Sequence, residues 1–252
     1  MLAQLSKHFN TSPEKISVSQ VKEYLYYCRE QRGLSNAFIN QTISALKILR
    51  QDVLGLEWDK KLKIKRPRRH HHLPTILSKS EVNNLVEVTA NPKHKAIIAT
   101  LYSTGVRLSE LLHLKLNDID STRMVIRITN GKGNKSRDTM LAEKTLKLLR
   151  DYYSSAYPKP SIYLFEGRSN PGKPYSSTSV RRVVKRAAAK AGIKKSISPH
   201  SLRHAFATHL LEQGVNIKMI QKLLGHGSMR ATSIYLHLAK LDASVKSPFD
   251  LP

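Results

Sequence analysis

Three side chains suited to binding anions lie at the start of one predicted helix, in the stretch SPHSLRHAFATHL. Ser198 can accept a hydrogen bond from an unpaired backbone N–H and Pro199 suits the first helical position, so a helix is expected to begin there. His200, Arg203 and His204 then fall within its first two turns. Because the helix dipole is already positive at that end, basic groups there indicate a bound anion, and the candidate is a phosphate.

Two further motifs complete a pattern along the chain. TGVRLSEL carries Arg107, and LGHGSMRATSIYLH carries His226 followed nine residues later by Tyr235. Together with the His-x-x-Arg motif of the predicted helix, they resemble the tyrosine recombinases of the phage integrase family, close to the bacterial Xer-type recombinases and the integrases of mobile elements. The stretch LSNAFINQTISALKILRQDVLG resembles the core-binding domain of that family, so the resemblance covers nearly the whole chain.

The resemblance implies an activity and a set of catalytic residues. Arg107 and Arg203 would clamp the scissile phosphate, with His200 and His226 beside it, and Tyr235 would attack it. Attack builds negative charge on the non-bridging oxygens, which planar guanidinium groups bind with paired hydrogen bonds. The phosphotyrosyl ester keeps the energy of the broken bond, so rejoining needs no ATP. The implied enzyme is a site-specific recombinase that cuts and rejoins DNA through a 3′-phosphotyrosyl intermediate, without a cofactor.

Two proton transfers accompany this reaction. Free tyrosine has a pKa of ~10, so the attacking hydroxyl needs a proton acceptor, and His200 is expected to be the best placed. The resemblance assigns the general acid that protonates the leaving 5′ oxygen to Lys132, in the glycine-rich turn NGKGNK. Lys135 of the same turn is the alternative.

The histidines also allow other uses. His200 and His204 are four residues apart and could ligate zinc, but Arg203 crowds the same face and no carboxylate follows in pattern. His204 and His209 are expected to serve helix packing or DNA contact. The internal triplet that begins at His70 has poor geometry for a metal site, so no metal is expected.

Three acidic residues have local interpretations. Glu110 follows Arg107 by three residues and is expected to orient its guanidinium group. Asp118 and Asp120 could suggest a magnesium nuclease, but they lie in turn-like sequence without further carboxylates. A turn is therefore expected at these aspartates.

The composition favours a polyanionic partner. The chain has 252 residues, with 43 Lys and Arg against 18 Asp and Glu, and a formal net charge of +25. Double-stranded DNA is the favoured partner. No segment approaches the ~20 apolar residues of a membrane span, and no signal-peptide core is present. We therefore expect a cytoplasmic protein without a membrane partner, and the family resemblance implies that it is bacterial and nucleoid-associated. Cys28 is the single cysteine and is expected to be buried in a helix.

Hydrophobic spacing predicts a mainly α protein with a small β-sheet. The resemblance implies the two-domain architecture of the tyrosine recombinases. Helices are expected over 18–33 and 35–54, in a helical core-binding domain over residues 1–66 whose first helix is shortened or missing. A basic linker is expected over 67–75, within a segment rich in Lys, Arg and Pro. The α+β catalytic domain would then span 76–252.

The expected catalytic domain has recognisable element boundaries. SKSE forms a capping box, a helix breaks at Gly105, and MVIRIT precedes the turn 130–135 as a strand that places Met124, Ile126 and Ile128 on one face. Helices are expected to end at Gly214 and Gly225, and a last helix bears Tyr235.

Two other functions compete with recombination. Residues 200–225 read as helix, turn and helix, so the chain could be a helix-turn-helix regulator of DNA without catalysis. A type IB topoisomerase would share the catalytic residues. The recombinase alternative implies inverted-repeat DNA sites and a synaptic tetramer, with a second recombinase as a further candidate partner. The tail from Leu238 onward is then expected to pack on the neighbouring protomer.

Overall fold

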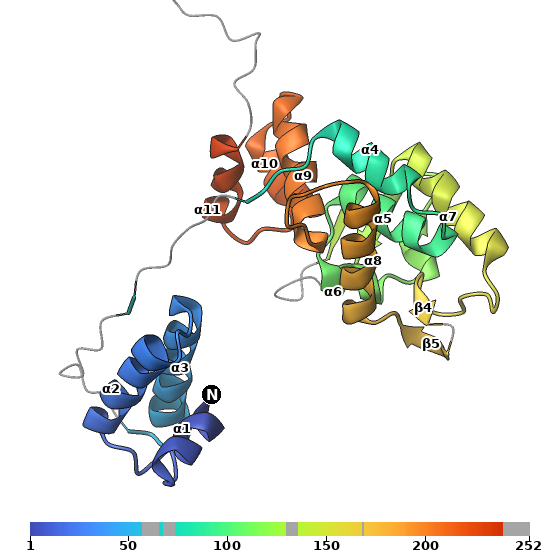
Figure 1. Cartoon of the computed structure of the whole chain (residues 1–252). Helices are drawn as coiled ribbons and strands as arrows, with labels where there is room; N and C mark the ends of the chain where they lie inside the picture. The colour runs from blue at the N-terminus through green and yellow to red at the C-terminus, as the bar shows by residue number, and fades with distance from the viewer. Residues whose placement is uncertain (57–65, 68–73, 130–135, 168, 239–252) are drawn as a thin grey trace, which may run out of the picture. The chain divides into compact units, whose positions relative to one another are not determined.

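The chain divides into two units, Met1–His72 and Leu73–Pro252 (Figure 1). Hydrophobic side chains gather in a separate core in each unit. The computed structural model describes residues 1–56, 66–67, 74–129, 136–167 and 169–238. Most of the expected linker 67–75, the histidine triplet at 70–72 and the turn 130–135 lie outside these residues. In the described ranges, no helix is both long and apolar enough to cross a membrane.

The described residues of the first unit form three α-helices. These are α1 (Leu2–Phe9), α2 (Val18–Tyr26) and α3 (Asn36–Ile48), and the last two continue into the π-helical turns η1 (Tyr27–Gln31) and η2 (Leu49–Val53). The hydroxyl of Ser35 accepts a hydrogen bond from Phe38 N (3.3 Å) and caps α3, as predicted. Cys28 is fully buried in the core formed by all three helices. The helices predicted over 18–33 and 35–54 are confirmed, and α1 is only eight residues long.

In the second unit, α5 (Pro92–Thr104) is the central helix. Around it pack α4 (Lys79–Glu87), α7 (Glu143–Ser155), α8 (Ser177–Lys190) and α9 (Pro199–Glu212). The predicted capping box at the start of α4 is present, with Ser78 and Glu81 each accepting the other's backbone N–H. Because α5 is apolar around most of its circumference, its burial organises the main core.

Among the described residues, two small antiparallel sheets accompany the helices. The first has the order β1–β2–β3, with β1 (Ile119–Asp120), β2 (Val125–Ile128) and β3 (Arg137–Met140), and the second pairs β4 (Glu166–Gly167) with β5 (Asn170–Pro174). Ile126 and Ile128 are buried on one face of β2, as alternation predicts. Met124 does not continue that strand, because its φ of 53° places it in the preceding turn.

The two aspartates before β2 form turns, as predicted. Asp118 ends the 3₁₀ turn η3 (Leu116–Asp118) and accepts the backbone N–H of Lys115 at 2.8 Å. Asp120 Oδ1 accepts the N–H groups of Thr122 and Arg123 at 3.1 and 2.8 Å. Both carboxylates are therefore used to fix the backbone.

Short helical segments complete the second unit. They are α6 (Leu108–His113), α10 (Ile217–Leu224), α11 (Met229–Thr232) and the 3₁₀ turn η4 (Ser233–His237). Ser198 and Pro199 begin α9 as predicted, although the capping bond runs from Ser198 N to Ser201 Oγ (3.1 Å). The expected last helix is divided, because Tyr235 lies on the 3₁₀ turn after α11.

Gly105 allows α5 and α9 to approach closely. It ends α5 with a φ of +60°, and a Cβ atom built there would lie 2.3 Å from Cδ1 of Phe206 on α9. A residue with a side chain would collide, so this turn requires glycine. The turn delivers Arg107, the N-cap residue of α6, to the neighbourhood of α9.

Candidate active site

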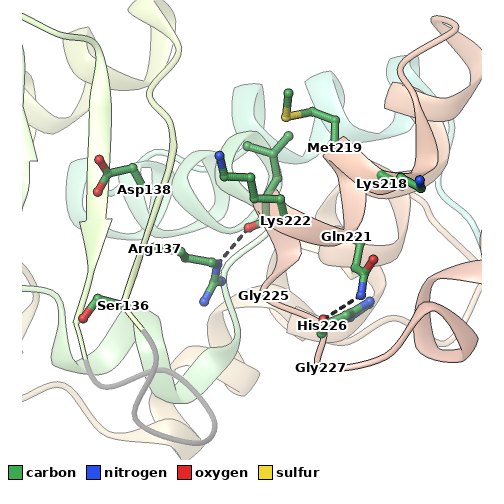
Figure 2. A pocket seen from close by; sticks show the side chains of 11 residues that line it. Ser136, Arg137, Asp138, Lys218, Met219, Gln221, Lys222, Gly225, His226 and Gly227 are labelled. Carbon is green, nitrogen blue, oxygen red and sulfur yellow. Dashed lines mark hydrogen bonds between the residues drawn. The ribbon is translucent and has the colours of Figure 1, made fainter.

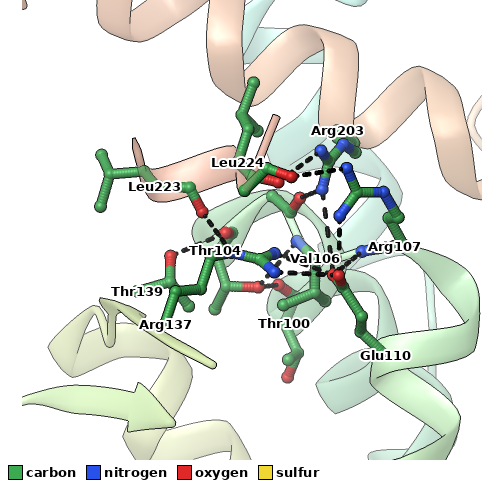
Figure 3. A network of polar contacts seen from close by, with 12 residues as sticks. Thr100, Thr104, Val106, Arg107, Glu110, Arg137, Thr139, Arg203, Leu223 and Leu224 are labelled. Atoms are coloured by element: carbon green, nitrogen blue, oxygen red, sulfur yellow. Dashed lines mark hydrogen bonds and ion pairs between the residues drawn. The ribbon is translucent and has the colours of Figure 1, made fainter. Parts of the chain in front are cut away.

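A buried carboxylate surrounded by guanidinium groups forms the centre of the site (Figure 3). Glu110 Oε1 and Oε2 accept hydrogen bonds from Arg137 at 2.9 and 2.8 Å, and Oε1 also accepts one from Arg107 Nη1 at 2.8 Å. Burial by itself raises the pKa of Glu110, but the hydrogen bonds from Arg137 and Arg107 and the charge of Arg137 outweigh it and lower the pKa to about 2. The expected pairing of Glu110 with Arg107 is confirmed.

Arg107 is held at three points. Its backbone N–H donates to Glu110 Oε2 (2.7 Å), which begins α6, and its Nη2 donates to the carbonyl of Gly225 (3.0 Å). The side chain remains 23% exposed. Its guanidinium group is therefore fixed in direction and still open to a ligand.

Arg203 is fully enclosed. Its side chain is 1% exposed, Nη1 donates to the carbonyl of Gly105 (2.5 Å), and Nη2 donates to that of Leu224 (2.7 Å). Burial and the charge of Arg107 lower the pKa of Arg203 to about 10, although Glu110 opposes them. Arg203 is therefore charged at neutral pH, and its Nε is a buried donor without a partner among the described residues.

Arg137 is a third arginine that sequence reasoning missed. It forms a fork on Glu110, and its Nε donates to the carbonyl of Leu223 at 2.8 Å. Spacing does not reveal it, because the register of β3 against β2 is what brings it to the site. One signal could have found it: Glu110 is the single acidic residue in the three motifs, and a carboxylate placed among arginines can pair with more than one of them.

The three arginines meet at the C-terminal end of α10. Three consecutive carbonyls, of residues 223, 224 and 225, accept hydrogen bonds from Arg137, Arg203 and Arg107 respectively. These carbonyls have no partner further along the helix and lie at the negative end of its dipole. The end of α10 therefore holds the three guanidinium groups in place.

Tyr235 and His226 lie beside the arginines. Tyr235 is 2% exposed, and burial raises the pKa of its hydroxyl while Arg203 and Arg107 oppose that rise. The His226 ring is parallel to the Tyr235 ring, with centroids 6.4 Å apart. His226 Nδ1 lies 2.9 Å from Thr232 Oγ1. Burial and nearby arginines, Arg203 foremost, lower the pKa of His226 to about 4.

His204, and not His200, contacts the Tyr235 hydroxyl. His204 Nδ1 lies 3.1 Å from Tyr235 Oη. His200 instead meets the His204 ring edge to face, with centroids 4.4 Å apart. The structure thus differs from the expectation that His200 is best placed to accept the hydroxyl proton. Tyr235 lies on a 3₁₀ turn, and its hydroxyl reaches His204, which is one helical turn after His200 on α9. Spacing along the sequence does not indicate this contact.

A cleft opens between β3 and the end of α10 (Figure 2). It has a volume of about 630 Å³, and Arg137, Lys222 and His226 are among its lining residues. Lys132 and Lys135 lie outside the described residues. Ser136, the first described residue after them, lines this cleft.

The remaining candidates have structural surroundings. His209 is 6% exposed, and its Nδ1 lies 2.9 Å from the Tyr102 hydroxyl, as the packing alternative predicts. In the part of the chain that the structure describes, no three His, Cys, Asp or Glu residues gather as a metal site. The site therefore brings Arg107, Arg203 and His226 together with Tyr235, and His200 joins them through His204.

Known proteins share this sequence and fold. Residues 75–241 match the phage integrase family. The tyrosine recombinase XerD of Oceanobacillus iheyensis is 33% identical over 253 residues, which cover 95% of this chain and 84% of that protein. The tyrosine recombinase XerA of Pyrococcus furiosus is 37% identical over 208 residues, covering 81% and 71%.

A solved structure agrees with the sequence comparison. The XerH site-specific recombinase, bound to its difH substrate in a pre-cleavage complex, aligns with a TM-score of 0.72 and 26% identity. The alignment covers 90% of this chain and 68% of that one. Its fold therefore matches the mainly helical architecture with small sheets that the sequence predicts. Two arginines, histidines and a buried tyrosine thus meet in a chain that belongs to the phage integrase family, and the protein is a tyrosine recombinase, an enzyme of site-specific DNA recombination.

Proposed function

We propose that Tyr235 attacks a scissile phosphodiester whose non-bridging oxygens are bound by Arg107 and Arg203. The observation that carries this assignment is the convergence of three separate sequence motifs on one positively charged site. Guanidinium groups match the geometry of phosphate oxygens and stabilise the charge that develops on them.

The charge balance of the site supports an anionic ligand. Three guanidinium groups surround Glu110, which is the carboxylate that pairs with them among the described residues. One negative charge does not neutralise three positive charges, so the site keeps a net positive charge. The Nε of Arg203 is a buried donor that lacks a protein acceptor in the same part of the chain. A phosphodiester under attack by a phenolate would supply both the missing charge and an acceptor.

The other predicted residues complete the proposed reaction. His200 and His226 would donate hydrogen bonds to phosphate oxygens, and Lys132 would protonate the 5′ oxygen as the phosphorus–oxygen bond breaks. Lys135 is the alternative acid. The cleft beside β3 supports this assignment, because Ser136, which directly follows Lys135 in the sequence, lines it.

The exposed face of α8 would bind the DNA backbone. Its buried side consists of small and β-branched residues, while its exposed basic residues are Arg181, Arg182, Lys185, Arg186 and Lys190. The exposed ion pairs of the described residues are formed by other basic side chains, so the charge of α8 is available to phosphates.

The larger assembly is also a proposal. Residues 1–66 would act as the core-binding domain, 67–75 as the basic linker and 76–252 as the catalytic domain. Four protomers would bring two inverted-repeat sites together, with the tail after Leu238 packing on a neighbour and with a second recombinase as an optional partner. An enzyme of this kind would work at the nucleoid in the cytoplasm.

Covalent trapping tests the proposed nucleophile. Purified protein is incubated with genomic fragments, the covalent complexes are isolated, and the attached DNA ends are sequenced. We expect one recurrent sequence joined through a 3′ phosphate to Tyr235, and no adduct with Tyr235→Phe. An adduct that survives in Tyr235→Phe would assign the nucleophile elsewhere.

The same material distinguishes the competing functions. A recombinase exchanges strands between two copies of the trapped sequence. A topoisomerase would relax a supercoiled plasmid without that sequence, and a regulator would bind DNA and form no adduct. Either result would overturn the recombination proposal.

A further inference from the structure

His204 contacts the atom that the proposed reaction uses as its nucleophile. Its Nδ1 lies 3.1 Å from Tyr235 Oη, and the two ring centroids are 5.6 Å apart. Tyr235 is 2% exposed, so its hydroxyl is largely withdrawn from water. Among the described residues, His204 provides the side-chain hydrogen bond that this hydroxyl makes.

The other two histidines are placed differently. His226 faces the Tyr235 ring in parallel, but its Nδ1 lies 2.9 Å from Thr232 Oγ1. His200 lies one turn before His204 on α9, and its ring meets that of His204 edge to face. His200 is exposed, so the pair connects the buried hydroxyl to the surface of the site. Of the three rings, His204 is the one in position to receive the hydroxyl proton.

We infer that His204 accepts the proton of Tyr235 during cleavage. The inference rests on the proposed function and adds the group that receives the proton. The Oη–H bond breaks and an Nδ1–H bond forms, while Oη bonds to phosphorus and the bond from phosphorus to the 5′ oxygen breaks. The leaving oxygen takes its proton from the general acid. On rejoining, His204 returns its proton to Oη.

The charges around His204 link this transfer to bound DNA. Burial, together with the charges of His200 and Arg203 on the same helix, lowers the pKa of His204 to about 4. The ring is therefore neutral and able to accept, while the imidazolium form is disfavoured. A phosphodiester next to Arg203 offsets the positive charge and makes the ring more basic. Tyr235, the group that faces it from η4, is thereby activated when DNA occupies the site.

Single-turnover cleavage of a nicked duplex that carries the trapped sequence tests the role. His204→Asn keeps an oxygen near the Nδ1 position, which can accept a hydrogen bond but cannot take up a proton. We expect adduct formation to fall about 100-fold with DNA binding unchanged. His113→Asn, an exposed histidine on α6, is the matched control and should cleave like the wild type.

Two further readouts separate a proton acceptor from a structural side chain. Replacing the bridging 5′ oxygen by sulfur removes the need for a general acid, so it should restore Lys132→Ala and leave His204→Asn slow. The acid limb of the pH–rate profile should vanish in His204→Asn and persist in His200→Asn. Restoration of His204→Asn by sulfur, or an acid limb that vanishes only in His200→Asn, would overturn the inference.

The wild-type protein provides a test that needs no variant. Nitrogen NMR of the histidine rings should show Nδ1 of His204 without a proton at neutral pH. A ring protonated at Nδ1 would donate to Tyr235 Oη and would overturn the inference, even if His204→Asn did not fold. An adduct retained in Tyr235→Phe would instead count against the proposed function.

Discussion

The side chain of Arg203 is almost completely buried and carries a positive charge. No carboxylate among the described residues lies within hydrogen-bond distance of it. The nearest acid, Glu110, lies 4.0 Å from its Nη1. Its two Nη groups reach carbonyls on different segments, and its Nε is left without a protein partner in the described part of the chain. The shape of the guanidinium group, in addition to its charge, is therefore what the site uses.

Replacing Arg203 by lysine tests the importance of this shape. Lysine keeps the charge but has one nitrogen, which cannot serve two carbonyls and a phosphate together. We expect Arg203→Lys to lower single-turnover adduct formation about 100- to 1,000-fold, as loss of a transition-state donor does, and Arg107→Lys to behave similarly. Arg150→Lys, on the exposed face of α7, is the control. A near-normal rate in either site variant would assign that arginine a structural role.

Glu110 stabilises the fold in a pH-dependent way. Its pKa is lowered from 4.5 to about 2, so its contribution is fully present above pH 4.5 and is lost as the pH falls from there towards 2. We expect Glu110→Gln to lower the free energy of unfolding by about 3 kcal/mol at pH 7, because Arg137 loses its buried partner. Urea denaturation from pH 7 to 3 measures this difference, which should shrink on acidification. A constant difference would contradict the linkage.

At the scale of elements, the junction between α5 and α9 sets the distance between Arg107 and Arg203. Gly105 lies where the two helices touch, and its carbonyl accepts the Nη1 hydrogen bond of Arg203. Two residues later, Arg107 begins α6. A shift of this turn would therefore move both arginines.

Alanine at this junction should be costly. Gly105→Ala would combine a positive φ with a Cβ atom 2.3 Å from Phe206, and we expect a loss of about 3 kcal/mol from strain and overpacking. Gly192→Ala is a matched control, because Gly192 also has a positive φ, of +68°, but no atom within 4 Å of the added carbon. It should lose only about 1 kcal/mol. Equal losses in thermal or urea denaturation would show that the contact with Phe206 is unimportant.

Local sequence signals predict the helices and their ends well. Ser35, the capping box at residues 78–81 and Gly225 act through neighbours in the chain, so their roles follow from spacing alone. The pairing of Arg107 with Glu110 also lies within one turn of sequence. Such features need no knowledge of tertiary structure.

Contacts between distant segments could not be predicted in this way. Arg137 reaches Glu110 through the register of β3, and His204 reaches Tyr235 through the 3₁₀ geometry of η4. Spacing along α9 alone favoured His200, because it says nothing of where the segment after α11 returns. The motifs therefore predict that Arg107, Arg203, His226 and Tyr235 meet, whereas the fold adds Arg137 and decides which atoms touch.

At the scale of the whole molecule, the net charge of +25 makes binding to DNA depend on salt. Basic residues of α8 contribute an exposed row that lies outside the carboxylate network of the site. This face and the site can therefore be varied independently.

Salt titration tests the contribution of α8. In Arg182→Gln/Arg186→Gln, the slope of log affinity against log salt should fall by about one for each phosphate that the helix no longer neutralises. Lys144→Gln/Lys147→Gln on α7 removes the same charge and should keep the slope near that of the wild type. A matching fall in both double variants would show that only the net charge matters.

The arginine anchors at the end of α10 affect how this protein tolerates sequence drift. Residues 223, 224 and 225 hold the arginines through backbone carbonyls, which every amino acid possesses. Substitutions at the partly exposed Leu223 that keep the helix intact therefore leave the anchor unchanged. Gly225 is the exception, because a Cβ atom there would lie 2.8 Å from Arg137 Nη1 at a φ of +60°. Side chains at this end of the helix can therefore change during evolution, while the backbone keeps the three arginines at the same distances from one another.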